Sequence, residues 1–275
     1  MKVIILGSKG MLGKYVWSYL DLAGFDCVGV NRDSLDAATA TERKLEEVFF
    51  KEIKLIEKGD VVINCMGTIK PRVDSLGDLN AIQVNSVFPR LLANFCEKHG
   101  LNLIHPTTDC VYTGLKGSYN ENDKYDVSDV YGMSKAMGEP NNCTVIRTSI
   151  IGEEVNQGRS LVEWVKSSAN TTVNGFTNHY WNGVTCLQFA KVCEELINTN
   201  NFWVGIKHIH SNTLNKQELV ETISDAYGLN ITVTPVETPA ACDRSMSTIH
   251  DTGIKVPTLK QQIQEMKEFS ETLYK

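Results

Sequence analysis

Short apolar runs alternate with longer amphipathic segments over residues 1–150. The apolar runs predict β-strands at residues 2–6, 26–30, 60–64, 101–104 and 143–150. Apolar residues at helical spacing predict helices at residues 11–23, 45–56, 81–99 and 129–139. Strands that alternate with helices, with no hairpin turns between them, imply an α/β fold with a Rossmann-type, doubly wound parallel sheet. Such a sheet binds ligands at the carboxyl ends of its strands.

The pattern is looser after residue 150 and predicts a smaller C-terminal α/β lobe over that ligand cleft. Helices are expected at residues 160–169 and 185–197, and strands at 204–209 and 231–236. Asn215 opens a further helix to Tyr227 with a capping sequence, and a polar helix follows Pro257. We therefore expect one domain at 1–150 and a substrate lobe at 151–275, with segments near 184–210 returning to the first domain.

Composition excludes several classes of protein. The chain has 275 residues, 42% of them hydrophobic and 22% charged, which is typical of a globular protein. No apolar run is long enough to cross a membrane, and the N-terminus lacks a secretory leader, so a cytoplasmic protein is expected. A net charge of −6 without a basic stripe argues against nucleic acid.

The cysteine and histidine pattern predicts neither disulfides nor a metal site. The chain has eight cysteines and no C-x-x-C pair, which is typical of reduced, buried thiols. His208 and His210 are two residues apart without a thiolate pair at ligand spacing, so no metal is expected.

A glycine-rich loop follows the first predicted strand and opens the first predicted helix. Gly7 permits a tight turn, Gly10 lets the backbone approach a pyrophosphate, and Gly13 lets helix and strand pack closely. The free N–H groups of the helix N-terminus would bind the phosphates. The sequence therefore predicts a dinucleotide-binding domain at 1–150, in which the loop residues Gly7, Lys9, Gly10, Met11, Leu12 and Gly13 contact the cofactor.

The end of the second strand favours NADP(H) over NAD(H). Asn31 and Arg32 stand where an acidic residue would bind the ribose 2′-hydroxyl of NAD. Arg32 can make a charge-assisted contact with a 2′-phosphate, whereas the neighbouring Asp33 keeps NAD open.

Tyr131 and Lys135 are four residues apart and therefore lie on one face of a helix. A neighbouring ammonium lowers the pKa of a phenol and makes it a usable acid or base. Thr107 and Thr108 follow the fourth strand, where one hydroxyl could bind the reacting oxygen of a substrate.

Together these motifs resemble the extended short-chain dehydrogenase/reductases, and most closely the branch typified by dTDP-4-dehydrorhamnose reductase. The resemblance is close over residues 1–150 and looser afterwards. It rests on residues 7–13, 64–67, 84–85 with Pro89, 107–112, 117–123 and 131–135 with Gly138 and Glu139, and on later echoes at 147–152, 175–178 and 243–245.

The resemblance implies NADPH-dependent reduction of the 4-keto group of a nucleotide-activated 6-deoxysugar. Tyr131 would protonate the ketone oxygen, Lys135 would lower the pKa of Tyr131 and hold the nicotinamide ribose, and Thr108 would position the carbonyl. Cys65, Met66, Gly67, Tyr131 and Lys135 would add to the cofactor site. The substrate site would comprise Thr108, Asp109, Cys110, Asn178, Trp181 and Arg244, with Arg244 on the diphosphate. Arg147, on an apolar strand, is expected to form a structural ion pair.

Cys110 departs from this pattern, because the rhamnose reductases tend to have Tyr there. Bifunctional relatives that epimerise C3 and C5 before the reduction resemble this chain at that position. Epimerisation needs an acid and a base on opposite faces of the ring. Cys110 could supply one of these groups, and His179 or Lys166 the other.

A non-catalytic, NADP-binding regulatory subunit is the third alternative. A pure sensor need not keep a hydroxyl, Tyr and Lys together, and this chain has all three. For any of these alternatives a homodimer is the ordinary expectation.

Overall fold

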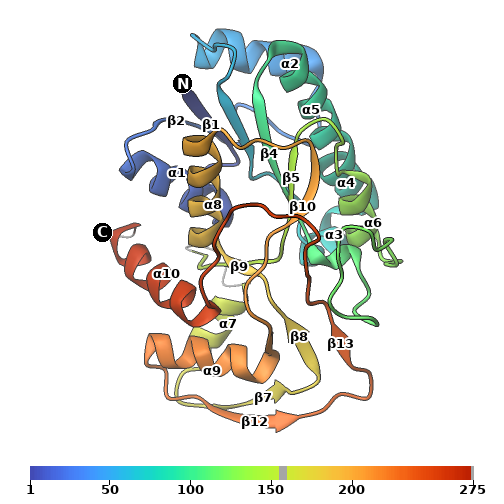
Figure 1. Cartoon of the computed structure of the whole chain (residues 1–275), viewed down its shortest axis with the longest axis vertical. Helices are drawn as coiled ribbons and strands as arrows, with labels where there is room; N and C mark the ends of the chain where they lie inside the picture. Colours follow the sequence, from blue (N-terminus) through green and yellow to red (C-terminus); the bar gives the residue numbers. More distant parts are fainter. Residues whose placement is uncertain (155–159, 274–275) are drawn as a thin grey trace.

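A six-stranded parallel sheet with helices on both faces forms the centre of the protein in a computed structural model (Figure 1). The structure describes residues 1–154 and 160–273. The strand order is β10-β5-β4-β3-β1-β2, and each neighbouring pair is parallel. The strands are β1 (Lys2–Leu6), β2 (Asp26–Val30), β3 (Val61–Asn64), β4 (Asn102–Thr107), β5 (Thr144–Arg147) and β10 (Gly205–His208). The predicted Rossmann-type sheet is confirmed.

Each face of the sheet has its own hydrophobic core, because successive side chains of a strand point to opposite faces. Ile4 and Leu6 of β1 pack in the core that includes α5 (Phe88–His99). Val3 and Ile5 pack in the other core, beneath α1 (Met11–Leu22) and α8 (Cys186–Thr199), which contact each other. All four side chains are fully buried, so the cores fix the register of β1.

The long helix predicted at 81–99 contains a π-helical turn. It consists of α4 (Asp78–Ile82), the π-helical segment η2 (Gln83–Val87) and then α5. The helix predicted at 45–56 is α2 (Glu42–Glu46) followed by the π-helical η1 (Glu47–Ile53). This helix ends before Ile56 because Lys54 and Leu55 have positive φ angles of 59° and 50°.

Strand β4 continues beyond its predicted end at residue 104 to Thr107, and Pro106 lies opposite Ile146 of β5. Proline cannot donate a ladder hydrogen bond, which is why the sequence pattern indicated an earlier end. The strand predicted to end at residue 150 ends at Arg147, and Ile150 belongs to β6 (Ile150–Ile151), which pairs with β9 (Val184–Thr185). Helix α3 (Lys70–Leu76) follows β3 and was not predicted.

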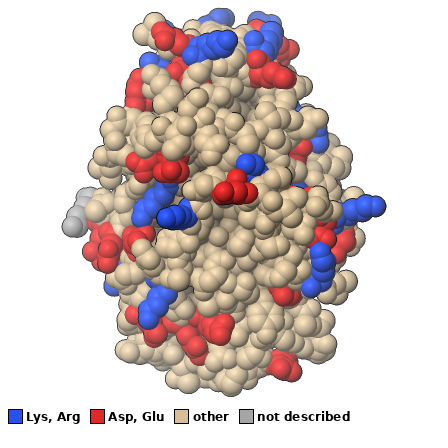
Figure 2. Space-filling view, viewed as in Figure 1, with Lys and Arg blue, Asp and Glu red and all other residues tan. Residues whose placement is uncertain are grey.

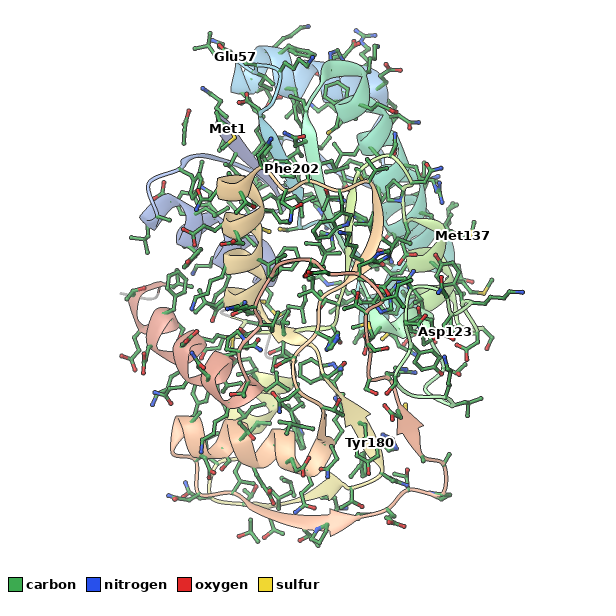
Figure 3. The ribbon with its side chains drawn as sticks, viewed as in Figure 1. Met1, Glu57, Asp123, Met137, Tyr180 and Phe202 are labelled. Atoms are coloured by element: carbon green, nitrogen blue, oxygen red, sulfur yellow. The ribbon has the colours of Figure 1, made fainter. Side chains whose placement is uncertain are left out.

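Helices and two of the small sheets lie together in the described part of the C-terminal lobe (Figure 1). Its helices are α7 (Leu161–Ser167), α9 (Lys216–Tyr227) and α10 (Leu259–Leu273). Strand β7 (Thr172–Phe176) pairs with β12 (Thr232–Val236), and β8 (His179–Trp181) lies between β11 (Leu214–Asn215) and β13 (Cys242–Asp243). Tyr180 of β8 is labelled in Figure 3. The predicted capping box is present, with Asn215 and Glu218 bonding each other's backbone N–H.

Positive and negative side chains are interspersed on the face of the molecule in Figure 2, with no continuous basic area. Within residues 1–154 and 160–273, no helix combines the length and apolar character needed to span a membrane. All eight cysteines are free thiols.

Candidate active site

The glycine loop lies at the carboxyl end of β1 and brings α1 against that strand. Gly7 has a φ of +80°, and a Cβ atom on Gly13 would lie 2.2 Å from the carbonyl oxygen of Gly7. Only a residue without a side chain fits this contact. Gly10 precedes α1, and no side chain caps the helix there. The first N–H groups of α1 therefore lack a side-chain cap and suit an anion.

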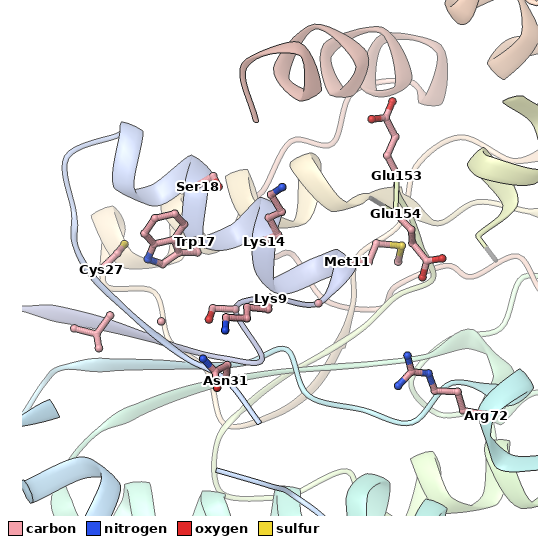
Figure 4. Close-up of a pocket in the computed structure, with 14 residues that line it drawn as sticks. Lys9, Met11, Lys14, Trp17, Ser18, Cys27, Asn31, Arg72, Glu153 and Glu154 are labelled. Carbon is pink, nitrogen blue, oxygen red and sulfur yellow. The ribbon is translucent and has the colours of Figure 1, made fainter. Parts of the chain in front are cut away.

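A cavity of about 800 Å³ lies beside this loop. Figure 4 shows Lys9 next to Asn31 on one side of this cavity, with Arg72 of α3 on the other side. Arg32, which the sequence suggested as the 2′-phosphate ligand, is exposed and is not among the lining residues. The side chain of Asn31 accepts a hydrogen bond from the Asp33 N–H at 2.8 Å. Lys9 is the basic side chain that the structure brings beside Asn31.

A second cavity, of about 450 Å³, continues from the first. Gly10, Met11, Arg72 and Glu154 line both cavities. The second cavity is also lined by most of the remaining predicted site residues, namely Leu12, Cys65, Met66, Gly67, Thr108, Asp109, Cys110, Tyr131 and Lys135. These residues meet because they follow the parallel strands β1, β3 and β4 at one edge of the sheet, or lie on the helix that covers this edge.

That helix, α6 (Val130–Met137), carries Tyr131 and Lys135. Asp129 caps it by accepting a hydrogen bond from the Gly132 N–H at 3.0 Å. A Cβ atom on Gly132 would lie 2.4 Å from the carbonyl oxygen of Cys110. Glycine therefore lets α6 pack directly on the short 3₁₀-helix η3 (Asp109–Val111), which follows Thr108.

The Thr108 side chain lies close enough to the Tyr131 phenol to affect its pKa. The Thr108 hydroxyl also accepts from the Cys110 N–H at 3.2 Å and donates to Asp109 Oδ1 at 3.1 Å. Burial raises the pKa of Tyr131, and the nearby Cys110 and Asp109 raise it further, whereas the nearby Thr108 hydroxyl lowers it. Overall, the pKa of Tyr131 is raised above its ordinary value.

Lys135 lies against Gly67, where a Cβ atom would be 2.9 Å from Nζ. Burial lowers the pKa of Lys135 to about 8, so the amine is mostly charged at neutral pH. From the sequence, Lys135 is expected to lower the pKa of Tyr131. In this structure burial is the largest influence on that pKa, and it outweighs the groups that lower it.

Asn85 in the π-helical η2 was not predicted to support the site. Its side chain accepts from the Thr68 N–H at 2.9 Å and donates to the Thr68 carbonyl at 3.0 Å. It also donates to the Ser134 hydroxyl at 3.2 Å. Asn85 therefore connects the loop after β3 with α6, and its place in the segment 84–85, which carries part of the resemblance, is the signal that could have revealed it.

Cys110 lines the second cavity, but His179 does not. Burial raises the pKa of the Cys110 thiol to about 12, so the thiol is neutral. The Nε2 atom of His179 lies 2.8 Å from the Thr238 hydroxyl. Lys166 lies 3.3 Å from Glu163 and 3.9 Å from Glu153, and it does not line either cavity. The structure therefore does not bring His179 or Lys166 to Cys110.

The three remaining substrate candidates lie in the C-terminal lobe and are not among the lining residues of either cavity. Asn178 bonds the backbone of Thr238. Trp181 is buried in the core of the lobe. Arg244 donates from Nε to the Tyr112 carbonyl at 3.0 Å, and its charge interacts with Asp109 and Cys110. Lys216, which was not predicted, interacts with these same two residues.

The fold and this site define a short-chain dehydrogenase/reductase of the extended type, with a glycine loop and a Thr–Tyr–Lys group on connected cavities. Residues 1–266 match the family described as the RmlD substrate binding domain. The chain therefore belongs to this family, as the resemblance in its sequence indicated.

Two relatives and one solved structure illustrate the similarity. The dTDP-4-dehydrorhamnose reductase of Mycobacterium tuberculosis (strain CDC 1551 / Oshkosh) is 30% identical over 145 residues, which cover 50% of this chain and 44% of that protein. The match thus spans about half the length of this relative. Methionine adenosyltransferase 2 subunit beta of Danio rerio is 25% identical over 247 residues, which cover 83% of this chain and 74% of that protein.

The solved structure is dTDP-4-dehydrorhamnose reductase from Bacillus anthracis strain Ames in complex with NADP. It superimposes with a TM-score of 0.79 at 19% identity and covers 98% of this chain and 99% of that one. This similarity supports the fold of the whole chain.

Proposed function

We propose that the protein is an NADPH-dependent reductase of the 4-keto group of a nucleotide-activated 6-deoxysugar. The observation that carries the proposal is the position of Thr108, Tyr131 and Lys135 on a cavity that continues into the cavity at the glycine loop. The name of the Mycobacterium tuberculosis relative and the NADP in the Bacillus anthracis structure support the same substrate class and cofactor. The expected homodimer and cytoplasmic location stay part of this proposal.

The residues of the glycine loop fit a dinucleotide. Gly7 and Gly13 bring the loop backbone close to α1, so that no side chain fills the space in front of the helix N-terminus. Lys9 and Asn31 would contact the adenosine end, and Gly67 and Lys135 the nicotinamide end. NADPH supplies the hydride when it is bound.

Tyr131 acts as the proton donor to the ketone oxygen. Its raised pKa keeps the phenol protonated at neutral pH, as a donor requires. Thr108, which lines the same cavity as Tyr131, positions the same oxygen by a hydrogen bond. Lys135 is charged below a pH of about 8 and stabilises the negative charge that develops on Tyr131 as the proton leaves.

Consumption of NADPH with a dTDP-4-keto-6-deoxysugar tests this proposal. We expect turnover by the unaltered protein and a loss of about 10²–10⁴-fold in kcat for Tyr131→Phe, with NADPH affinity unchanged. A Tyr131→Phe variant with full turnover would remove the catalytic role of Tyr131.

A bifunctional 3,5-epimerase/4-reductase is the first alternative, and the position of Cys110 in the cavity favours it. The second acid or base that epimerisation needs is not at this cavity, because His179 is bonded to Thr238 and does not line either cavity. Incubation with a 4-keto-6-deoxysugar nucleotide in deuterated water tests this alternative. Deuterium at C3 or C5 of the recovered sugar would favour it, and absence of label would exclude it.

A dinucleotide-binding regulatory subunit is the second alternative. The match to the subunit beta of Danio rerio favours it, since that match covers more of this chain than the match to the Mycobacterium tuberculosis reductase. Tight NADPH binding without turnover of any 4-keto sugar nucleotide would favour this alternative over the reductase.

A further inference from the structure

Strand β2 lies at one edge of the central sheet, and β1 is its one neighbour in the strand order. The Gly7 N–H donates to the Val30 carbonyl at 2.7 Å, so the backbone of Val30 faces β1. Along a strand, the backbone groups of successive residues point alternately to its two sides. The backbone of Val28 therefore also faces β1, and the N–H and C=O groups of Cys27 and Gly29 face outward.

The outward edge of β2 is open to another strand. Gly29 is exposed although it lies inside the strand. Within residues 1–154 and 160–273, no second strand pairs with β2. Proteins usually protect such an edge with lysine, proline or a bulge, because its unpaired backbone groups bind other strands. The sequence of β2, DCVGV, has neither lysine nor proline, so this edge is suited to pairing.

The glycine-loop cavity extends along this open edge. Cys27, Val28 and Gly29 line it together with Trp17 of α1. Three consecutive residues line one cavity where it reaches round the edge of a strand, since their side chains alternate between the two faces. Figure 4 shows Trp17 beside Cys27, at the end of the cavity away from Arg72. Trp17 is 37% exposed, and a Cβ atom on Gly29 would lie 3.6 Å from its Cδ1 atom, so the indole borders the edge.

The outward groups of β2 fit an antiparallel copy of the same strand. When a two-fold axis passes beside Val28, Cys27 of one copy lies opposite Gly29 of the other, and each of these pairs exchanges two N–H···O bonds. Every outward backbone group of β2 is then paired. The two Val28 residues face each other in a non-hydrogen-bonded pair, where side chains approach most closely and β-branched residues pack well. Strand β2 is therefore self-complementary in its hydrogen bonds.

The charges at the two ends of β2 suit the same arrangement. The charged residues near the amino end are Lys2, Asp21 and Asp26, and those near the carboxyl end are Lys9, Arg32 and Asp33. Each group contains one ion pair, Lys2–Asp26 at 3.2 Å and Lys9–Asp33 at 3.9 Å, which leaves the amino end negative and the carboxyl end positive. Antiparallel pairing brings the negative end of each copy to the positive end of the other, so the contact is charge-complementary.

We propose that two copies of this chain associate through β2, about a two-fold axis beside Val28, and form one continuous sheet across both copies. Trp17 of each copy, which lies over its own Gly29, then contacts Cys27 of the other copy, a favourable sulfur–aromatic contact. The second copy also closes the outer end of the glycine-loop cavity. The proposal identifies the surface of the homodimer expected from the sequence, and it does not depend on the reductase activity.

Sedimentation velocity of the unaltered protein and of two variants at Val28 tests the proposal. A charge introduced at Val28 faces the same charge across the two-fold axis, so Val28→Lys and Val28→Glu should each raise the Kd of the dimer about tenfold or more. An equimolar mixture of the two variants should restore the dimer, because the two introduced charges are then opposite in sign. Such a rescue is specific to a contact in which residue 28 meets itself.

Ile206→Lys is the matched control, because Ile206 is a partly buried residue of β10, the strand at the other edge of the sheet. It should leave the dimer unchanged. Cys27→Pro is a second test, since it removes an outward N–H and no bond to β1, and it should also raise the Kd. Thermal melting followed by circular dichroism shows whether each variant is folded.

A monomeric unaltered protein would overturn the proposal, as would an unchanged dimer in folded Val28→Lys or Cys27→Pro. A mixture of the two Val28 variants that stays monomeric would also overturn it. Loss of the dimer in Ile206→Lys alone would place the contact at the other edge of the sheet and overturn the role of β2.

These outcomes are distinguishable from failure of the proposed reductase, because association is measured without substrate. A monomeric protein that reduces 4-keto sugar nucleotides would retain the reductase and remove this contact. A dimer that depends on Val28, without any such reduction, would retain the contact and remove the reductase.

Discussion

Arg147 of β5 and Glu139, two residues past the end of α6, form a buried, two-pronged ion pair. Arg147 Nε lies 2.9 Å from Glu139 Oε1, and Nη2 lies 2.7 Å from Oε2. The structural ion pair expected for Arg147 is thus confirmed. Arg147 also donates to the Tyr112 hydroxyl at 2.6 Å. The pair fixes the end of the helix that carries Tyr131 and Lys135 against the central sheet.

Glu139→Gln should destabilise the protein strongly, because it leaves the Arg147 guanidinium buried without a carboxylate. Breaking a buried pair in this way costs about 3–5 kcal/mol of unfolding free energy. Urea denaturation followed by circular dichroism measures this loss. Glu42→Gln, which removes the exposed ion pair with Lys98, is the control and should leave the urea midpoint unchanged.

Gly67→Ala should lower kcat without preventing folding. The added methyl group would lie 2.9 Å from Lys135 Nζ and would displace this flexible side chain from its place beside Gly67. A misplacement of about 1 Å in a catalytic group can cost about a hundredfold in rate. Steady-state kinetics measure the effect on kcat, and the melting temperature measures the effect on folding stability. Unchanged kcat in a folded Gly67→Ala variant would show that the position of Lys135 does not limit the rate.

Cofactor preference should depend on Lys9 and not on Arg32. Lys9 lines the glycine-loop cavity beside Asn31, whereas Arg32 is exposed outside it. We expect Lys9→Met to weaken NADPH binding about tenfold relative to NADH, since it removes a charge-assisted contact with the 2′-phosphate. Arg32→Met is the matched control. Fluorescence titration measures the ratio of the NADPH and NADH affinities. A larger change in this ratio for Arg32→Met than for Lys9→Met would support Arg32 as the 2′-phosphate ligand, as the sequence suggested.

The free energy of unfolding should fall as the pH drops below about 6.5, partly because of His208. Burial lowers the pKa of His208, and the Arg147 charge lowers it further. His208 Nε2 lies 2.9 Å from Arg147 Nη1, and Nδ1 lies 2.8 Å from the Ser247 carbonyl. Nδ1 thus carries the proton of a neutral ring.

The sign follows from the lowered pKa. Above pH 6.5 His208 is neutral in both the folded and the unfolded chain, and its contribution is complete. Below that pH the unfolded chain binds a proton that the folded protein does not, so stability is lost as the pH falls. Urea midpoints measured across this range should fall less steeply for His208→Gln than for the unaltered protein. Parallel curves for the two proteins would contradict this assignment.

The sequence predicted most of the central sheet and part of the lining of the two cavities. Continuous apolar runs, such as the residues of β1 and β3, are typical of buried strands. The glycines at 7, 10 and 13 predict the turn that follows β1. Tyr131, Lys135 and Thr108 were found because their spacing and position after a strand are local features.

Features that depend on tertiary contacts were missed or misplaced. The strands β8, β11 and β13 have only two or three residues each, too few for a periodic pattern. His179 seemed suited to the cleft only because its bond with Thr238, 59 residues later, is invisible in the local sequence. From the sequence, Lys216 is only the first residue of a capped helix. Its contact with the Trp181 ring depends on the tertiary structure.

Strand β10 has a consequence for any attempt to divide this chain. It covers the outer edge of β5, so that residues 205–208 complete a sheet begun at residue 2. A fragment ending near residue 150 would expose the backbone of β5 as an open, apolar edge, which invites pairing between copies. Attempts to produce the nucleotide-binding half alone should therefore yield aggregates, unless the segment through His208 is fused back to it.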